Sequence, residues 1–206
     1  MIWTQSSTGR VLDLTAPYKT APQISVAEIA HSLAQINRFT GHAVRPISVA
    51  EHSLLVCDIT ERVLGLGLHA QLAALLHDAH ECITNDLATP MKRQMGRAWT
   101  DMEHEWARAF ISAFCLGAAW ATHAEQLHQA DLIALATERR DLMHPGGPPW
   151  ASLVGIEPLQ GVNLRDRDAF TWDDWRQAFI DRYDELQHGL FQHAQHQHHH
   201  HQRHTA

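Results

Sequence analysis

A hydrophobic segment that ends in ionisable residues is the first candidate for chemistry in this chain. The segment AALLHDAHE, residues 73–81, starts with four apolar residues, then places His77 beside Asp78, with Glu81 three positions later. Burying even a neutral polar group without a partner costs roughly 2–7 kcal/mol, so a buried helix ending this way needs compensation. Imidazole and carboxylate groups both bind divalent metal ions, and a bound ion is one candidate for that compensation.

Two further candidate ligands lie on other predicted helices. His52 stands in the first turn of a helix expected to start after Ser48, and Asp131 stands midway along the segment HQADLIALATERRD. Helices of a bundle can direct such side chains to one point. Taken singly, His52 is more typical of a capping or core-edge histidine, and Asp131 of a paired or solvated acid. The adjacent pair His77–Asp78 on an apolar segment is rarer, and it favours a metal site.

The ligand types indicate which ion and which reaction to expect. Two imidazoles and two carboxylates suit a borderline or hard divalent ion, with Zn, Co, Mn, Mg and Fe as candidates. An ion that accepts five or six ligands keeps a position for water and lowers the pKa of that water from 15.7 toward about 7. The pattern therefore favours hydrolysis.

The elements that must position these residues are predicted to be helices. Capping boxes, in which Ser or Thr precedes an acidic residue by three positions, favour helix starts at Ser25, Ser48, Thr100, Thr122 and Thr171. The last four of these helices are expected to end near Gly65, Leu116, Leu142 and His188, and a short helix is expected over about 69–80. Five capping boxes in phase with helical apolar spacing predict an all-α fold.

The rest of the chain is predicted to contain one small hairpin, one long loop and a tail. The segment STGRVLDL is compatible with a hairpin, and residues 144–170 form a loop rich in Gly and Pro, with Trp150 as its expected anchor. We expect a single domain over residues 1–190. Residues 191–206 are rich in histidine and are predicted to be a disordered tail.

Composition excludes several classes of function. The net charge of −7 argues against non-specific binding to nucleic acid, which needs a basic face. No apolar run approaches the roughly 18 residues that a membrane helix needs. The N-terminal segment lacks the pattern of a signal peptide, and the three cysteines are too far apart for a disulfide framework. We therefore expect a cytoplasmic protein without a membrane or nucleic-acid partner.

Four motifs together resemble the HD-domain phosphohydrolases. They are SVAEHS, LLHDAHE, NDLATPMK and ADLIALATERRDL, and the resemblance covers about residues 4–188. It is strongest to the branch that contains bacterial 5'-deoxynucleotidases and phage deoxynucleoside triphosphohydrolases, including the phage dATPase. The opening STGRVLDL and the segment INRFTGH are more similar to the phage group.

The resemblance implies an HD-domain helical bundle and a role for each motif residue. His52, His77, Asp78 and Asp131 match the metal ligands. Glu81 matches an acid that orients or deprotonates the attacking water, and Asp86 an acid that positions water or sugar. Arg38 and Lys92 match phosphate contacts, and Phe39 stands where relatives have an aromatic that can stack on a base. From the residues alone, Phe39 is equally typical of a core residue. Lys92 and Arg93 are equally typical of a solvated pair. Glu138 is equally typical of a surface partner of Arg139.

The function implied is hydrolysis of a deoxynucleotide by a homo-oligomer. The phage-like N-terminal segment favours removal of triphosphate from a deoxynucleoside triphosphate, and a 5'-deoxynucleotidase that releases orthophosphate is the alternative. A dinuclear iron oxygenase is a further alternative, in which His80 with His104, His123 or His128 would supply the added ligands. The last alternative is a protein that binds nucleotides without hydrolysing them. His80 replaces a small residue of the relatives, and its role is open.

Overall fold

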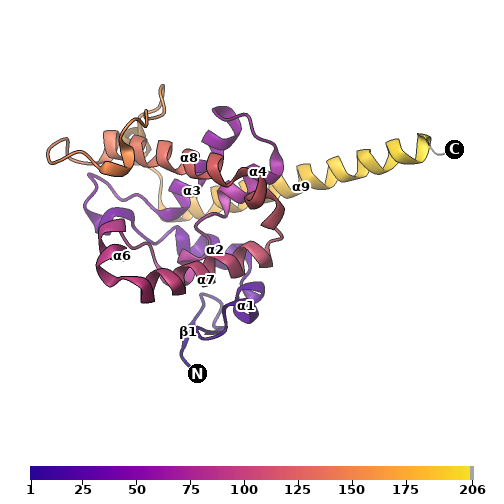
Figure 1. Ribbon diagram of the computed structural model, residues 1–206, viewed down its shortest axis with the longest axis horizontal. Helices are drawn as coiled ribbons and strands as arrows, with labels where there is room; N and C mark the ends of the chain where they lie inside the picture. Colours follow the sequence, from indigo (N-terminus) through magenta and orange to yellow (C-terminus); the bar gives the residue numbers. More distant parts are fainter. Residues whose placement is uncertain (205–206) are drawn as a thin grey trace.

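The structure is a computed structural model that describes the backbone of residues 1–204 and the side chains of residues 1–196. Helices dominate it (Figure 1), which confirms the predicted all-α fold. The α-helices are α1 (Pro17–Thr20), α2 (Val26–Leu33), α3 (Val49–Arg62), α4 (Leu68–Leu75), α5 (Glu81–Thr84), α6 (Thr89–Met95), α7 (Arg97–Ala113), α8 (Gly117–Leu142) and α9 (Trp172–His204). Four short 3-10 turns are η1 (Ala21–Gln23), η2 (Arg38–Gly41), η3 (Ala151–Leu153) and η4 (Leu164–Arg167).

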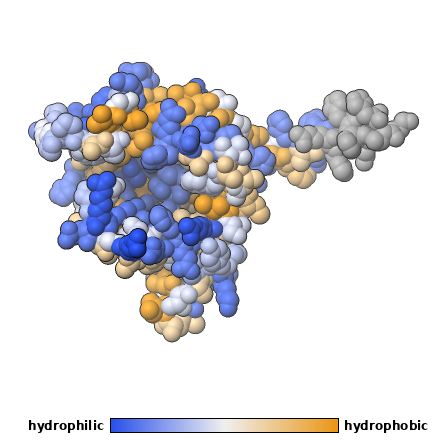
Figure 2. Space-filling model, in the orientation of Figure 1, coloured by the Kyte–Doolittle hydropathy of each residue, from blue (hydrophilic) through white to orange (hydrophobic). Residues whose placement is uncertain are grey.

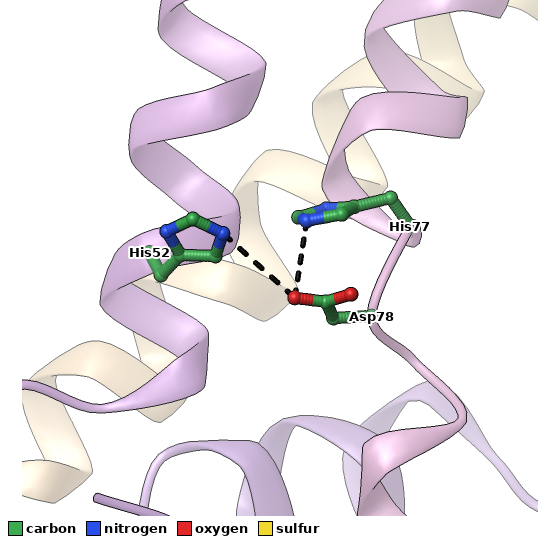
Figure 3. Close-up of side chains that lie close together, drawn as sticks. All are labelled: His52, His77 and Asp78. Atoms are coloured by element: carbon green, nitrogen blue, oxygen red, sulfur yellow. Dashed lines mark ion pairs between the residues drawn. The ribbon is translucent and has the colours of Figure 1, made fainter. Parts of the chain in front are cut away.

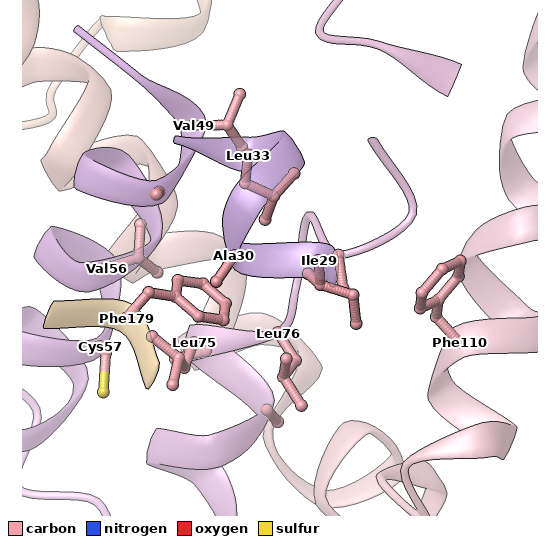
Figure 4. Packing of buried hydrophobic residues seen from close by; sticks show 14 of the residues in the cluster. Ile29, Ala30, Leu33, Val49, Val56, Cys57, Leu75, Leu76, Phe110 and Phe179 are labelled. Carbon is pink, nitrogen blue, oxygen red and sulfur yellow. The ribbon is translucent and has the colours of Figure 1, made fainter. Parts of the chain in front are cut away.

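The core lies where α2, α3, α4, α8 and α9 meet. Helix α3 packs against α4, α8 and α9, while α4 also contacts α8 and α9. Figure 4 shows Phe179 of α9 inserted among apolar side chains that include Val56 of α3 and Leu75 of α4, all of them fully buried. Because α3, α4 and α8 share this core, their positions relative to one another are fixed by packing.

A two-stranded antiparallel hairpin precedes the helices. Strand β1 (Trp3–Gln5) pairs with β2 (Val11–Asp13), and the turn between them contains Gly9 at φ 84°. A positive φ of this kind favours glycine. The small hairpin predicted near STGRVLDL is therefore confirmed, with its first strand slightly earlier in the chain.

The predicted helix starts at Ser25, Ser48 and Thr171 are confirmed. Ser25 and Glu28 form a reciprocal capping box at α2, and Thr171 forms the same arrangement with Asp174 at α9. The Ser48 hydroxyl accepts the backbone N–H of Glu51 at 3.1 Å. The carboxylate of Glu51, however, binds the guanidinium of Arg45 instead of the cap backbone.

The predicted starts at Thr100 and Thr122 are wrong. Helix α7 begins at Arg97, because Gly96 at φ 73° both ends α6 and precedes α7. Helix α8 begins at Gly117, and the Thr122 hydroxyl donates to the carbonyl of Ala118 at 2.9 Å inside the helix. The backbone of His123 has a φ of −123°, so α8 is kinked next to the residue where the sequence pattern predicted a start.

The short helix predicted over about 69–80 ends earlier than expected. Helix α4 stops at Leu75, and Leu76 has φ −100° and ψ 9°. His77 and Asp78 therefore lie in the turn between α4 and α5, not in the last helical turn.

The 144–170 segment is attached to the helices by arginine side chains. Arg140 donates to the carbonyls of Leu159 at 2.7 Å and Val162 at 2.8 Å, and Arg45 donates to the carbonyl of Leu164 at 2.6 Å. These bonds attach the loop through its backbone carbonyls.

Helix α9 is longer than predicted. It continues past His188 to His204, and its C-terminal part extends away from the other helices (Figure 1). Leu186 is fully buried and Leu190 packs against the core, so apolar contacts continue beyond the expected end. The backbone of the predicted tail is thus helical to His204, and residues 205–206 lie outside the described residues. Among the described residues, no helix is long and apolar enough to cross a membrane.

Candidate metal centre

The structure brings His52, His77 and Asp78 together between α3 and the turn after α4. One carboxylate oxygen of Asp78 lies 3.1 Å from Nε2 of His77 and 3.7 Å from Nε2 of His52. Figure 3 shows both imidazole rings directed toward this carboxylate. All three potential ligand atoms lie within 4.8 Å of one another, which is close enough for one ion to contact all of them.

Asp131 of α8 adds the fourth predicted residue to this cluster. Its Oδ1 atom lies 3.1 Å from Nε2 of His52. The structure therefore brings three of the four predicted ligands within reach of one ion and places the fourth, Asp131, against His52.

The imidazole nitrogens that face the cluster lack ordinary hydrogen bonds. Nε2 of His52 and Nε2 of His77 are both buried, and neither has a partner with hydrogen-bond geometry despite the nearby carboxylates. Buried nitrogens are normally satisfied, so two orphaned nitrogens that face the same carboxylate fit a missing cation. The donor set of two imidazoles and two carboxylates also fits a divalent ion.

The opposite nitrogen of each ring is anchored. Nδ1 of His52 lies 2.6 Å from Oε1 of Glu138, and Nδ1 of His77 lies 2.7 Å from the carbonyl of Ala74. Both acceptors place a ring proton on Nδ1, so Nε2 is the nitrogen that can bind an ion once the ion displaces its proton. Metal-binding histidines are commonly oriented in this way.

Glu138 is the functional residue that sequence reasoning missed. It is fully buried, and its second oxygen accepts from Nε of Arg38 at 3.2 Å. It does not form the surface pair with Arg139 that the sequence suggested. Glu138 lies seven residues, or two helical turns, after Asp131 and so on the same face of α8, which is the sequence signal that could have found it.

The charge pattern of the site favours a bound cation. Burial and Arg38 both oppose a charge on His52, but Glu138 and Asp131 outweigh them and raise its pKa to about 9. Burial would likewise raise the pKa of Asp78, yet the two histidines hold that pKa well below its usual range. The carboxylates therefore stay ionised and create a negative potential at the ring nitrogens.

Glu81 and Asp86, the two predicted catalytic acids, lie on the α5 side of the cluster. Glu81 is 3% exposed, and burial together with the charges of Asp78 and Asp86 raises its pKa well above the usual value. Burial also raises the pKa of Asp86, whose Oδ2 lies 3.8 Å from a guanidinium nitrogen of Arg38. A carboxyl group with a raised pKa is a candidate for proton transfer in a reaction.

The predicted phosphate contacts are both held by carboxylates. Arg38 is 8% exposed and pairs with Glu138 and Asp86. Because Glu138 also binds His52, it links Arg38 to the centre. Lys92 of α6 forms an ion pair with Glu103 of α7 at 2.6 Å and is not the solvated residue that the sequence alone allowed.

Phe39 lies at the edge of the site on η2. Its backbone has a φ of 55°, a value that non-glycine residues rarely adopt. The ring is half-buried, lies 5.4 Å below the guanidinium of Arg38, and is tilted against Trp150 with 5.9 Å between ring centroids. Trp150 in turn lies under Arg139 at 5.1 Å. Loop 144–170 therefore contacts the site through its predicted anchor residue.

Hydrophilic residues gather over the middle of one face of the molecule. Figure 2 shows them around a hollow, with more apolar surface above and below it. This placement gives a polar ligand a hydrophilic surface to approach.

The fold and the site define an all-α protein with a partly buried His and Asp cluster suited to a divalent ion. Comparison with known proteins identifies relatives of this chain. The chain is 39% identical over 144 residues to an uncharacterized protein of Rhodobacter capsulatus, RCAP_rcc00048, covering 68% of this chain and 72% of the relative. It is 33% identical over 141 residues to the uncharacterized protein YfdR of Escherichia coli, covering 68% and 74%. The chain belongs to the same family as these two proteins. No family model matches it.

Proposed function

We propose that this protein is a metal-dependent phosphohydrolase of deoxynucleotides. The observation that carries the proposal is the pair of orphaned Nε2 atoms on His52 and His77, which face the carboxylate of Asp78 with Asp131 beside them. These residues come from three parts of the chain, α3, α8 and the turn after α4, and Glu138 binds the opposite nitrogen of the His52 ring. The likeness of the motifs to HD-domain phosphohydrolases supplies the reaction class.

His52, His77, Asp78 and Asp131 would hold the ion. When bound, the ion would supply an activated water and neutralise charge on the scissile phosphate. Glu81, a buried carboxyl group whose pKa is raised by burial and by Asp78 and Asp86, would orient the water and accept its proton. Asp86, fixed by Arg38, would position the water or the sugar.

The substrate class is supported by the groups around the centre. Arg38 offers a guanidinium, whose planar set of donors matches phosphate oxygens. Phe39 offers a half-buried ring on which a base can stack. We propose a deoxynucleoside triphosphate as the preferred substrate because the N-terminal motifs resemble the phage group, and a deoxynucleoside monophosphate as the alternative. The three cysteines are free, which supports a reducing compartment such as the cytoplasm.

Product analysis tests the proposal. The protein is incubated with deoxynucleoside mono- and triphosphates, and with their ribose forms, in the presence of Mn²⁺, Co²⁺, Mg²⁺ or Zn²⁺, and the products are separated by chromatography. Deoxynucleoside and triphosphate appearing together, without a diphosphate intermediate, is the expected result. Turnover of monophosphates alone would favour the nucleotidase, and no turnover of any nucleotide would overturn the proposal.

Matched variants separate the centre from its surroundings. His77→Ala removes a proposed ligand, and we expect it to abolish turnover. His69→Ala removes an exposed histidine of α4 and should leave turnover unchanged. Equal activity of the two variants would exclude His77 from the active site.

A further inference from the structure

A second cluster of potential ligands lies beside the first and shares no residue with it. His80 and Glu81 stand at the start of α5, and Glu103 comes from α7. Each offers one ligand atom, and these atoms all lie within 4.8 Å of one another. A single ion placed between them would therefore reach all three side chains.

Two side chains of this cluster carry polar atoms with no partner. Nδ1 of His80 and Oε2 of Glu81 are buried and form no hydrogen bond. His80 is 7% exposed and Glu81 is 3% exposed, so solvent does not satisfy them. An unsatisfied buried polar group costs about 1–3 kcal/mol, and more if charged, so two of them side by side indicate a missing partner.

The charged groups of this second cluster are compatible with a bound cation. Lys92 is bound to Glu103 at 2.6 Å and neutralises one of the two carboxylates. A carboxylate has two oxygens, so Glu103 can bind Lys92 and an ion at the same time. The ion pair also holds Glu103 of α7 in position against α6.

We propose that His80, Glu81 and Glu103 form a second divalent-cation site. One imidazole and two carboxylates suit a borderline or hard ion of the Mn²⁺, Fe²⁺, Co²⁺ or Zn²⁺ class. Three protein ligands leave positions open for water or for an oxygen of a bound anion. The proposal does not rest on the proposed function, because it needs only the cluster itself; if both hold, Glu81 would contact the second ion with one oxygen and the attacking water with the other.

Counting and locating Mn²⁺ in the full-length protein tests this site. Mn²⁺ is chosen because it binds imidazole least strongly among the first-row divalent ions, which limits binding to the His-rich C-terminal segment. Equilibrium dialysis gives the number of tight sites, and anomalous diffraction of Mn²⁺-soaked crystals gives their positions. We expect one ion at His52, His77, Asp78 and Asp131, and a second at His80, Glu81 and Glu103.

Two variants, each with a matched control, assign the second ion. Glu103→Gln should lose one equivalent of Mn²⁺, while Glu105→Gln, on the exposed side of the same helix, should lose none. His80→Ala should also lose one equivalent, with exposed His104→Ala as its control. All variants carry the same His-rich segment, so its contribution cancels.

The outcomes separate the two centres. Asp78→Asn should remove the first ion and leave the second anomalous peak in place. A wild-type protein without a peak between His80 and Glu103 would overturn the second site, whatever the first site binds. Unchanged stoichiometry in both Glu103→Gln and His80→Ala would overturn it as well. If the wild-type protein bound both ions but hydrolysed no nucleotide, only the proposed function would be contradicted.

Discussion

The candidate metal centre depends on residues that do not face the proposed ion. Glu138 accepts from Nδ1 of His52 with one oxygen and from Arg38 with the other. It therefore fixes the ring whose Nε2 faces the cluster and also keeps Arg38 next to Asp86. One fully buried carboxylate thus positions both a proposed ligand and a proposed substrate contact.

Replacing Glu138 by glutamine should weaken metal binding. The amide of Glu138→Gln is close in size to the carboxyl group, but it lacks the charge that favours the Nδ1–H tautomer of His52. We expect the dissociation constant for Mn²⁺ at the first centre to rise about 10- to 100-fold, as is usual when such a supporting group is lost. Calorimetric titration measures this change. Glu125→Gln, at an exposed position on the same helix, is the control, and equal constants in the two variants would show that Glu138 has no such role.

The predicted ligands could be recognised from the sequence because their residue types are rare on apolar segments. His77 and Asp78 break an apolar run, and the structure places them beside His52 and Asp131. Glu138 was not recognised, because an adjacent arginine offered a simpler partner. Its true partners lie 86 and 100 positions away along the chain, and only the tertiary packing of α3 and η2 against α8 brings them to it.

Individual helices show where a local sequence pattern is enough to predict a helix start. The capping boxes at Ser25 and Thr171 formed as predicted, because in both the acidic side chain three positions later accepts from the cap backbone N–H. The boxes at Thr100 and Thr122 failed because the helices had already begun at Arg97 and Gly117. A capping pattern shows that a helix can start at a residue, whereas packing of the preceding turn decides whether it does.

The capping box of α2 should give the protein a specific dependence on pH. Burial alone would raise the pKa of Glu28, but hydrogen bonds from Thr8 and Ser25 outweigh it and lower this pKa to about 2 from an ordinary value of 4.5. A lowered pKa in the folded state means that the ionised form is stabilised by folding. This contribution is fully present above about pH 4.5 and is lost as the pH falls toward 2.

Comparing wild type with Glu28→Gln isolates this contribution. The free energy of unfolding, measured in urea between pH 2.5 and pH 7, should differ most between the two proteins above pH 4.5. The difference should shrink as the pH falls, because protonated Glu28 and glutamine are both neutral. A difference that stays constant across this range would show that the charge of Glu28 contributes nothing. Exposed Glu125→Gln should give no such trend.

At the scale of the whole molecule, Arg45 joins the start of α3 to the 144–170 loop. Arg45 precedes α3, forms two hydrogen bonds with Glu51 at 2.8 and 2.6 Å, and donates to the carbonyl of Leu164 in the 144–170 loop. Glu51 is 1% exposed and lies next to His52. Arg167 of the same loop stands 3.7 Å from Glu51. One buried carboxylate thus connects the loop to the start of α3, next to a residue of the candidate metal centre.

Arg45→Met should therefore destabilise the entire fold. The variant leaves Glu51 buried with only the more distant Arg167, and breaking a buried ion pair in this way costs about 3 kcal/mol or more. The free energy of unfolding in urea measures this loss, and exposed Arg62→Met should change it by less than about 0.5 kcal/mol. Adding Glu51→Gln to Arg45→Met should restore part of the lost stability, because the unpaired charge is removed. If the double variant were less stable than Arg45→Met, the loss would come from the missing contact to Leu164 and from packing, and the buried carboxylate would not be the element that couples loop and helix.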